Sequence, residues 1–374
     1  MKQETKAIHT GQQIDPYTGA IVSPIHMSST FQRDLDGEYS KGHVYSRYTN
    51  PNRQALEQCM ADLEGGIEAA AFSSGSAAMM TLLQTLVPGD HVIAPDIIYF
   101  GIMELMKKVF SPLGIRFDFV DMSQLDLIES HITESTKLII VETPSNPQLT
   151  ITDIKAVVAI AKAQSQDIKV AVDNTIATPI LQLPLALGAD YVIHATTKYI
   201  AGHSDVLGGM VITKAQDKRW EKLKYIQKMG GAVPSPFECW LTLRGIQTMS
   251  YRVRAMTDHA KQIAAFLQAH PKVESVLYPG IEGTPFYEVA SRQMKDYGVL
   301  MSFLVKGGAQ EAIAVTNRLK LITRATSFGG THSLIEHRHS VEAEGTKTPE
   351  NLLRLSIGLE HVDDLIEDLE QGLR

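Results

Sequence analysis

The sequence has little cysteine and no metal-binding motif. Only two cysteines, Cys59 and Cys239, occur among its 374 residues, and they show neither C-x-x-C nor metal-ligand spacing. A disulfide scaffold and a metal site are therefore not expected. Because few cysteines without such spacing are typical of a reducing compartment, we expect the protein to be cytoplasmic.

Runs of basic residues and long apolar segments are also missing. The formal net charge is −7, and no cluster of Lys and Arg provides a local surface for nucleic acid. No stretch approaches the ~20 apolar residues that span a membrane, and residues 1–6 lack the apolar core of a signal peptide. We therefore expect neither a nucleic-acid nor a membrane partner.

The N-terminal region differs in composition from the rest of the chain. Residues 1–55 are predicted to form an irregular arm, because Pro, Gly, Ser, Thr and Tyr are frequent over the first ~50 positions and no periodicity is sustained. The arm ends where Pro51 can begin a helix that stops at Gly65. A segment of this kind needs another surface to lie on.

Residues 56–235 are predicted to form a large α/β domain. Short apolar runs alternate with amphipathic segments, which is typical of a mostly parallel sheet with helices on both faces. Seven runs predict seven strands, at 69–72, 91–94, 117–120, 138–141, 168–172, 191–193 and 209–212. Ligands gather at the carboxyl ends of such strands, which selects segments 73–76, 142–147, 173–175 and 194–205.

Residues 236–374 are predicted to form a smaller α+β domain, entered by a linking helix at 238–267. Its polar stretch 336–350 is predicted to be a mobile loop. Strands are expected near 273–277, 299–305, 321–324 and 352–357, and helices near 286–294, 309–319 and 362–373.

The segment 73–76 stands where a strand leads into a helix. The N–H groups of Gly75 and Ser76 and the positive end of the helix therefore predict an anion site. A serine that only caps the helix would produce the same pattern. Tyr45 and Arg47 are candidates for further phosphate contacts, although an arginine in a polar loop is usually a solvated charge.

Two charged residues stand at strand ends. Lys198 follows the apolar run 191–193 in a segment rich in hydroxyls, an unusual place for a surface cation. Asp173 would be partly buried, where an unpaired charge is costly, so either it faces a cation or it is a capping residue. A pyridinium nitrogen, kept protonated by the carboxylate, is such a cation. Together with the anion site, these two residues predict pyridoxal 5′-phosphate.

With these residues in place, the chain resembles the Cys/Met-metabolism (trans-sulfuration) family of pyridoxal-phosphate enzymes. This family includes cystathionine γ-synthase, cystathionine β- and γ-lyases, methionine γ-lyase and O-acylhomoserine sulfhydrylases. The resemblance rests on Tyr-Ser-Arg-x-x-Asn-Pro at 45–51, Glu-Thr-Pro-Ser-Asn-Pro at 142–147, Val-Asp-Asn-Thr at 172–175, Thr-Lys-Tyr-x-x-Gly-His-Ser-Asp at 197–205 and Leu-Arg-Leu-Ser-Ile-Gly-Leu-Glu at 353–360. It implies fold type I, with a seven-stranded sheet in the large domain.

The resemblance also implies roles for matching residues. Lys198 looks like the lysine that holds the cofactor as a Schiff base and then moves protons, and Asp173 like the partner of the ring nitrogen. Tyr99 resembles the tyrosine that stacks on the ring and assists proton transfer. The other expected cofactor contacts are Gly75, Ser76, Asn146, Thr175, Thr196 and Thr197, of which Thr196 or Thr197 replaces a hydroxyl lost at Ala195.

For the substrate, Arg354 matches the arginine that binds the α-carboxylate, with Ser327 beside it. Tyr45 and Arg47 resemble a pair that reaches the phosphate of a neighbouring subunit. The resemblance therefore implies that the arm lies on a partner, within a homotetramer that is a dimer of dimers with shared active sites.

Several positions depart from the family pattern. Glu104 stands where cystathionine-handling members often have arginine, and His332 where they often have glutamate. The stretch 333–340 lacks the usual Pro-Ala-x-x-Thr-His run, and Gly101 replaces the cysteine of methionine γ-lyases. Either Glu104 and His332 face solvent, or they form a pocket for a neutral or cationic distal group of the substrate.

The resemblance predicts an enzyme, a carbon–sulfur lyase of the cystathionine γ- or β-type. It would release a 2-oxo acid, ammonia and a thiol from a small amino-acid substrate. The alternative is γ-replacement, as in cystathionine γ-synthase or O-acylhomoserine sulfhydrylase, and a more distant one is a non-catalytic oligomer that binds the cofactor.

Overall fold

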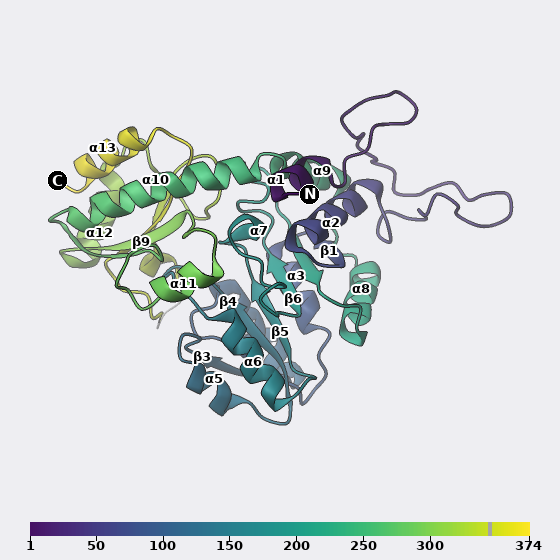
Figure 1. The fold of residues 1–374 in the computed structure, drawn as a ribbon, viewed down its shortest axis with the longest axis horizontal. Helices are drawn as coiled ribbons and strands as arrows, with labels where there is room; N and C mark the ends of the chain where they lie inside the picture. The colour runs from purple at the N-terminus through teal and green to yellow at the C-terminus, as the bar shows by residue number, and fades with distance from the viewer. Residues whose placement is uncertain (343–345) are drawn as a thin grey trace.

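Two β-sheets organise the chain, one of seven strands and one of five. The computed structural model describes residues 1–342 and 346–374. Figure 1 shows the seven-stranded sheet in the lower part of the view, the five-stranded sheet at the upper left and the N-terminal arm at the upper right. The mostly parallel large sheet and the second, smaller sheet confirm the predicted α/β fold class.

The seven-stranded sheet has the order β1-β7-β6-β5-β4-β2-β3. Only β7 runs antiparallel to its neighbours; the other adjacent pairs are parallel. All seven predicted runs form strands: β1 (Glu68–Phe72), β2 (His91–Pro95), β3 (Arg116–Val120), β4 (Thr136–Glu142), β5 (Lys169–Asp173), β6 (Tyr191–His194) and β7 (Gly209–Thr213). The middle residues of the central strands β4 and β5 are apolar and buried, as expected for strands that helices cover on both faces.

The helices of this region divide between the two faces. On one face pack α3 (Gly75–Leu83), α4 (Phe100–Leu105) and α8 (Lys218–Gly230). On the other face α5 (Leu125–His131) and α6 (Ile154–Gln164) cover one half, and α2 (Pro51–Glu64) covers the other. The short helices are α7 (Thr178–Leu181), the π-turn Met106–Phe110 and the 3₁₀ turn Ser111–Leu113.

The five-stranded sheet has the order β10-β11-β12-β9-β8. Its strands are β8 (Val273–Leu277), β9 (Leu300–Val305), β10 (Thr323–Arg324), β11 (Leu334–His337) and β12 (Leu352–Ser356). The helices around it are α10 (Met249–Ala269), α11 (Tyr287–Gln293), α12 (Gly308–Arg318) and α13 (Val362–Gly372). Figure 1 shows α10 running from the neighbourhood of α1 to that of α13. One hydrophobic core therefore includes residues of both sheets.

The structure corrects three predictions about elements. The arm contains a helix, α1 (Gln3–His9), and the linking helix is two helices, α9 (Pro236–Ile246) and α10, which break at residues 247–248. The polar stretch 336–350 is not a loop from its beginning, because β11 extends to His337 and a 3₁₀ turn follows at Arg338–Val341. The strand end was not predicted because Glu336 and Arg338 are buried as an ion pair, so charged residues stand where a buried strand usually has apolar ones. The prediction for residues 343–345 lies outside the described residues.

The rest of the arm is irregular, as predicted. It makes one isolated bridge, between Thr30 and Tyr45, and Figure 1 shows it as two loops that extend away from the body. Large apolar side chains of the arm are exposed: Tyr17, Ile21, Val22, Met27 and Leu35. Several exposed apolar side chains in one segment are typical of an interaction surface. None of the helices described here is long and apolar enough to cross a bilayer.

Candidate active site

The four strand-end segments selected from the sequence meet at one edge of the seven-stranded sheet. Glu142 and Asp173 are register partners at the ends of β4 and β5. The Thr175 hydroxyl accepts a hydrogen bond from the Ala195 N–H at 2.8 Å, and a Cβ on Gly75 would lie 2.8 Å from the Ala195 Cβ. The carboxyl ends of these strands therefore form a common rim.

Lys198 lies between the two sheets, in a partly buried position. Its Nζ donates to the Ser327 hydroxyl at 2.5 Å and lies 4.7 Å from the centre of the Phe328 ring. Burial, and next the nearby Arg354, lower the pKa of Lys198 to about 8. An amine with this pKa is substantially neutral near pH 8, the form that acts as a nucleophile or base.

Two carboxylates lie side by side at the rim. Burial raises the pKa of Asp173, and burial together with Asp173 raises the pKa of Glu142 to about 8. Asp173 accepts a hydrogen bond from the Thr175 N–H at 3.0 Å, as a capping residue would, and no cationic side chain of the described residues forms an ion pair with it. The site lacks a cationic partner for this carboxylate.

Glu142 is a residue to which the sequence assigned no role. Its carboxylate accepts the backbone N–H of Tyr99 at 3.0 Å and that of Asn146 at 3.1 Å. One buried side chain therefore fixes the backbone on which two predicted site residues stand. Its position at the end of a buried strand was the available signal, but a backbone acceptor cannot be recognised from sequence.

The predicted anion site has the expected geometry at the start of α3. Ser74 caps the helix and accepts from the Ala77 N–H at 3.0 Å, so the capping explanation holds for Ser74 itself. The N–H groups of Gly75 and Ser76 belong to the first turn and have no partner within the helix. A Cβ on Gly209 would lie 2.1 Å from the Ser74 carbonyl oxygen, so glycine is required for this close approach.

The two threonines before Lys198 both lie against Gly208. The Thr197 hydroxyl accepts the Gly208 N–H at 3.0 Å. A Cβ on Gly208 would lie 2.3 Å from Thr196 Oγ1. Both hydroxyls are therefore held close to the rim, and Thr197 already has a backbone partner.

Arg354 stands on β12 and is almost completely buried. Its guanidinium donates to the Ser327 carbonyl at 2.7 Å and to Asn146 Oδ1 at 3.2 Å, and it forms an ion pair with Glu336 at 3.1 Å. Its Nε has no hydrogen-bond partner among the residues that the structure describes. Burial lowers the pKa of Arg354 to about 10. A buried guanidinium with an unpaired N–H is suited to bind a carboxylate.

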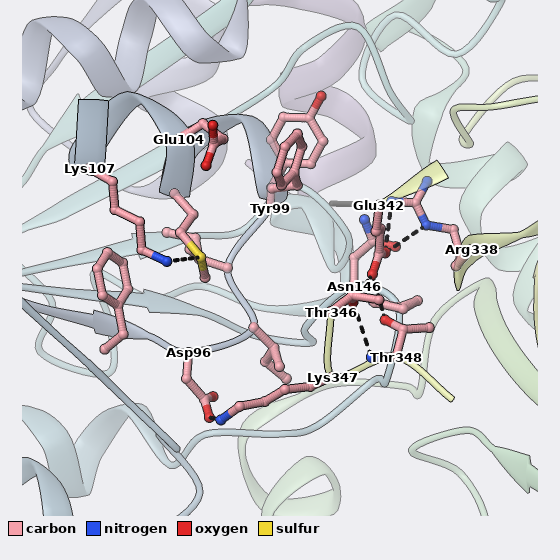
Figure 2. A pocket seen from close by; sticks show the side chains of 16 residues that line it. Asp96, Tyr99, Glu104, Lys107, Asn146, Arg338, Glu342, Thr346, Lys347 and Thr348 are labelled. Atoms are coloured by element: carbon pink, nitrogen blue, oxygen red, sulfur yellow. Dashed lines mark hydrogen bonds and ion pairs between the residues drawn. The ribbon is translucent and has the colours of Figure 1, made fainter. Parts of the chain in front are cut away.

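A cavity of about 360 Å³ opens beside Tyr99 and Asn146. Figure 2 shows Glu104 above it, Lys107 on one side and Arg338 with Glu342 on the other. Glu104 lines the cavity and forms an ion pair with Lys108. His332 is exposed and is not among the lining residues. The structure therefore does not bring the two departures from the family pattern into one cavity wall.

Tyr45 and Arg47 lie on the arm. The Arg47 guanidinium donates to the Lys228 carbonyl at 2.7 Å and stacks on the Tyr48 ring, 4.7 Å from its centre. Neither side chain hydrogen-bonds to the start of α3 within this chain.

Comparison with known proteins identifies the family and supports the fold. A family model described as "Cys/Met metabolism PLP-dependent enzyme" matches residues 4–374. The chain belongs to this family. The cystathionine γ-synthase of Mycobacterium leprae is 45% identical over 375 residues, which cover 99% of this chain and 96% of that protein. The cystathionine γ-lyase of Dictyostelium discoideum is 41% identical over 377 residues, which cover 99% and 97%. The crystal structure of metB from Corynebacterium glutamicum has a TM-score of 0.97 and 43% identity, covering 100% of this chain and 98% of that one.

The protein is thus a pyridoxal-phosphate-dependent enzyme, and its rim fits the cofactor. Among the described residues no Lys, Arg or His side chain forms an ion pair with the buried Asp173, Lys198 offers an amine of lowered pKa, and the start of α3 at Gly75 packs so closely on Ala195 that it leaves no room for a Cβ. In the described part of the chain, no group of three or more His, Cys, Asp or Glu side chains has metal-binding geometry.

Proposed function

We propose that the protein is a carbon–sulfur lyase of sulfur amino-acid metabolism, of the cystathionine γ- or β-type. One observation carries this proposal: Ser327 holds both Lys198, through its hydroxyl, and Arg354, through its carbonyl. An amino acid whose α-carboxylate binds Arg354 therefore has its Cα beside the Lys198 amine. This is the geometry that removal of the Cα proton requires.

Each residue at the rim has a proposed part in this reaction. When bound, pyridoxal phosphate supplies an electron sink next to the substrate Cα. Lys198 would hold the cofactor and then carry the proton taken from Cα, and Asp173 would keep the ring nitrogen protonated. Tyr99 would stack on the cofactor ring and assist proton transfer. The other cofactor contacts are Gly75, Ser76, Asn146, Thr175, Thr196 and Thr197.

The test is a substrate panel with the purified holoenzyme. Cystathionine, homocysteine, cysteine and methionine are scored for release of 2-oxo acid, ammonia and thiol. A lyase releases 2-oxo acid in proportion to thiol, and Lys198→Ala abolishes both. Absence of 2-oxo acid from every substrate would refute the lyase proposal.

A cystathionine γ-synthase is the second candidate, and sequence similarity favours it. The mycobacterial synthases are 44–45% identical to this chain, against 41% for the β-lyase of Coxiella burnetii and the γ-lyase of Dictyostelium discoideum. A synthase would form cystathionine from an O-acylhomoserine and cysteine. The ratio of cystathionine formed to 2-oxo acid released decides between the two.

We also propose a homotetramer, a dimer of dimers. Each chain would consist of an arm (residues 1–55) that lies on a partner subunit, a large domain (56–235) and a C-terminal domain (236–374). The exposed apolar side chains of the arm support this assembly. Tyr45 and Arg47 would then contact the phosphate held by the neighbouring subunit. Both cysteines are free and buried, which supports a cytoplasmic location. Light scattering measures the mass of the assembly. Arg47→Ala should weaken cofactor binding and leave that mass unchanged.

A further inference from the structure

A carboxylate competes for the arginine that is proposed to bind the substrate. Glu336 Oε2 lies 3.1 Å from Arg354 Nη2, and the two residues are register partners on β11 and β12. Both side chains are buried, so water screens their attraction only weakly. An isolated Arg354–Glu336 pair would be neutral, and a substrate carboxylate would meet the repulsion of Glu336.

A second arginine shares the same carboxylate oxygen. Arg338 Nη1 donates to Glu336 Oε2 at 2.7 Å, which is closer than the Arg354 contact. Arg338 is also buried, and it lies in the stretch 333–340 that departs from the family pattern. With two guanidinium groups on one carboxylate, the group of three carries a positive charge.

The far side of Arg338 is bound by Glu342. Arg338 Nε and Nη2 donate to Glu342 Oε1 at 3.1 and 3.0 Å, and the hydroxyls of Thr346 and Thr348 donate to Oε2 at 2.6 Å each. Figure 2 shows this cluster on one wall of the cavity. Four donor groups from three residues therefore bind the Glu342 carboxylate, and Arg338 uses Nε and Nη2 for this contact while its Nη1 donates to Glu336.

We propose that Arg338 is a positioning residue for substrate binding, which neutralises Glu336 so that Arg354 remains free to bind the α-carboxylate. The charge balance explains the requirement. Arg354, Glu336, Arg338 and Glu342 sum to zero, whereas the same group without Arg338 carries −1 and repels a carboxylate. The proposal rests on the role proposed above for Arg354.

The experiment measures carboxylate recognition by the holoenzyme. L-alanine and L-alaninamide, which lack a leaving group, are titrated against the visible absorption of the bound cofactor, and the ratio of their Kd values reports the carboxylate contact. In Arg338→Met we expect alanine to bind about 10- to 100-fold more weakly and alaninamide to bind nearly as before. KM of the turned-over substrate should rise by a similar factor, with a smaller change in kcat.

A double variant separates charge balance from structural damage. In Glu336→Gln/Arg338→Met the competitor is also removed, so the preference for alanine over alaninamide should return to within about threefold of wild type. Arg292→Met is the matched control, because Arg292 forms an exposed ion pair with Asp153 away from the site, and it should change neither Kd. A double variant as impaired as Arg338→Met would overturn the proposal.

If Arg338→Met does not fold, Glu336→Gln alone is decisive: we expect tighter alanine binding, and weaker binding contradicts the proposal. The same titrations distinguish failure of the role proposed for Arg354 from failure of the inference about Arg338. If wild type binds alanine and alaninamide equally, Arg354 does not recognise the carboxylate. If wild type discriminates and Arg338→Met discriminates equally, only the inference about Arg338 is refuted.

Discussion

The two sheets contribute different kinds of groups to the site. The edge of the seven-stranded sheet presents residues at strand ends, such as Asp173, Gly75 and the segment of Lys198, whose positions follow from the backbone. The five-stranded sheet presents Arg354 and Arg338, which are held by buried ion pairs with Glu336 and Glu342. The first side depends on backbone geometry, and the second depends on charge balance.

This difference separates chemistry from recognition. Changes at the edge of the seven-stranded sheet, the cofactor side of the site, should lower kcat and alter the absorption of the cofactor. Changes on the substrate side should raise KM and leave that absorption intact, because no cofactor contact is removed. The following predictions test this division, beginning with the largest effect.

Replacing Lys198 tests the cofactor side. Lys198→Ala should lower kcat by at least about 10³-fold, since both the covalent anchor and the proton carrier are lost. Release of 2-oxo acid and the visible absorption after borohydride treatment measure the effect. Lys108→Ala, which removes an exposed amine that forms an ion pair with Glu104, is the control. A kcat within tenfold of wild type would remove Lys198 from the mechanism.

Replacing Arg354 tests the substrate side. Arg354→Met should raise KM about 10²-fold, because the buried guanidinium proposed to bind the substrate carboxylate is lost, while the absorption of the bound cofactor stays that of wild type. Steady-state kinetics and a spectrum of the resting holoenzyme check both parts. A changed spectrum with unchanged KM would break the division between the two sides.

The paired carboxylates should make the cofactor-free protein depend on pH. The folded-state pKa of Glu142 is raised from 4.5 to about 8, so the folded form binds the proton more tightly than the unfolded form. The free energy of unfolding should therefore fall as pH rises from about 4.5 to 8, by on the order of 1 kcal/mol or more. Urea unfolding across this range measures it, and Glu142→Gln should flatten the slope. An equal slope in that variant would contradict the assignment.

Glu104 should have the smallest effect. Glu104→Arg places a cation on the cavity wall, so kcat/KM for cystathionine or O-succinylhomoserine should rise about three- to tenfold. Substrates without a distal acid, such as homocysteine, serve as the control. If kcat/KM for cystathionine and O-succinylhomoserine is the same in Glu104→Arg as in wild type, Glu104 does not contact the distal group.

Much of the cofactor side could be predicted because it follows local rules. Apolar runs marked all seven strands of the large sheet, and the strand-end rule brought Asp173 and Lys198 to one rim. β11 could not be found in this way, since its last residues, Glu336 and His337, are polar yet buried. Phe328 and Glu142 were also missed, because a ring beside an amine and a carboxylate below two backbone N–H groups leave no pattern in the sequence.

The sequence by itself determined the family, the cofactor and the strand ends proposed to bind it, because each short motif is local and the strand-end rule places the motifs at one edge of the sheet. Only the tertiary structure decided which charges meet. Glu336 and Arg338 are two residues apart, but Arg354 joins them from another strand and Glu342 from the following turn. Ion pairs of this kind depend on burial and on distances across the sheet. The proposed recognition of the substrate therefore depends on contacts that spacing along the chain cannot show.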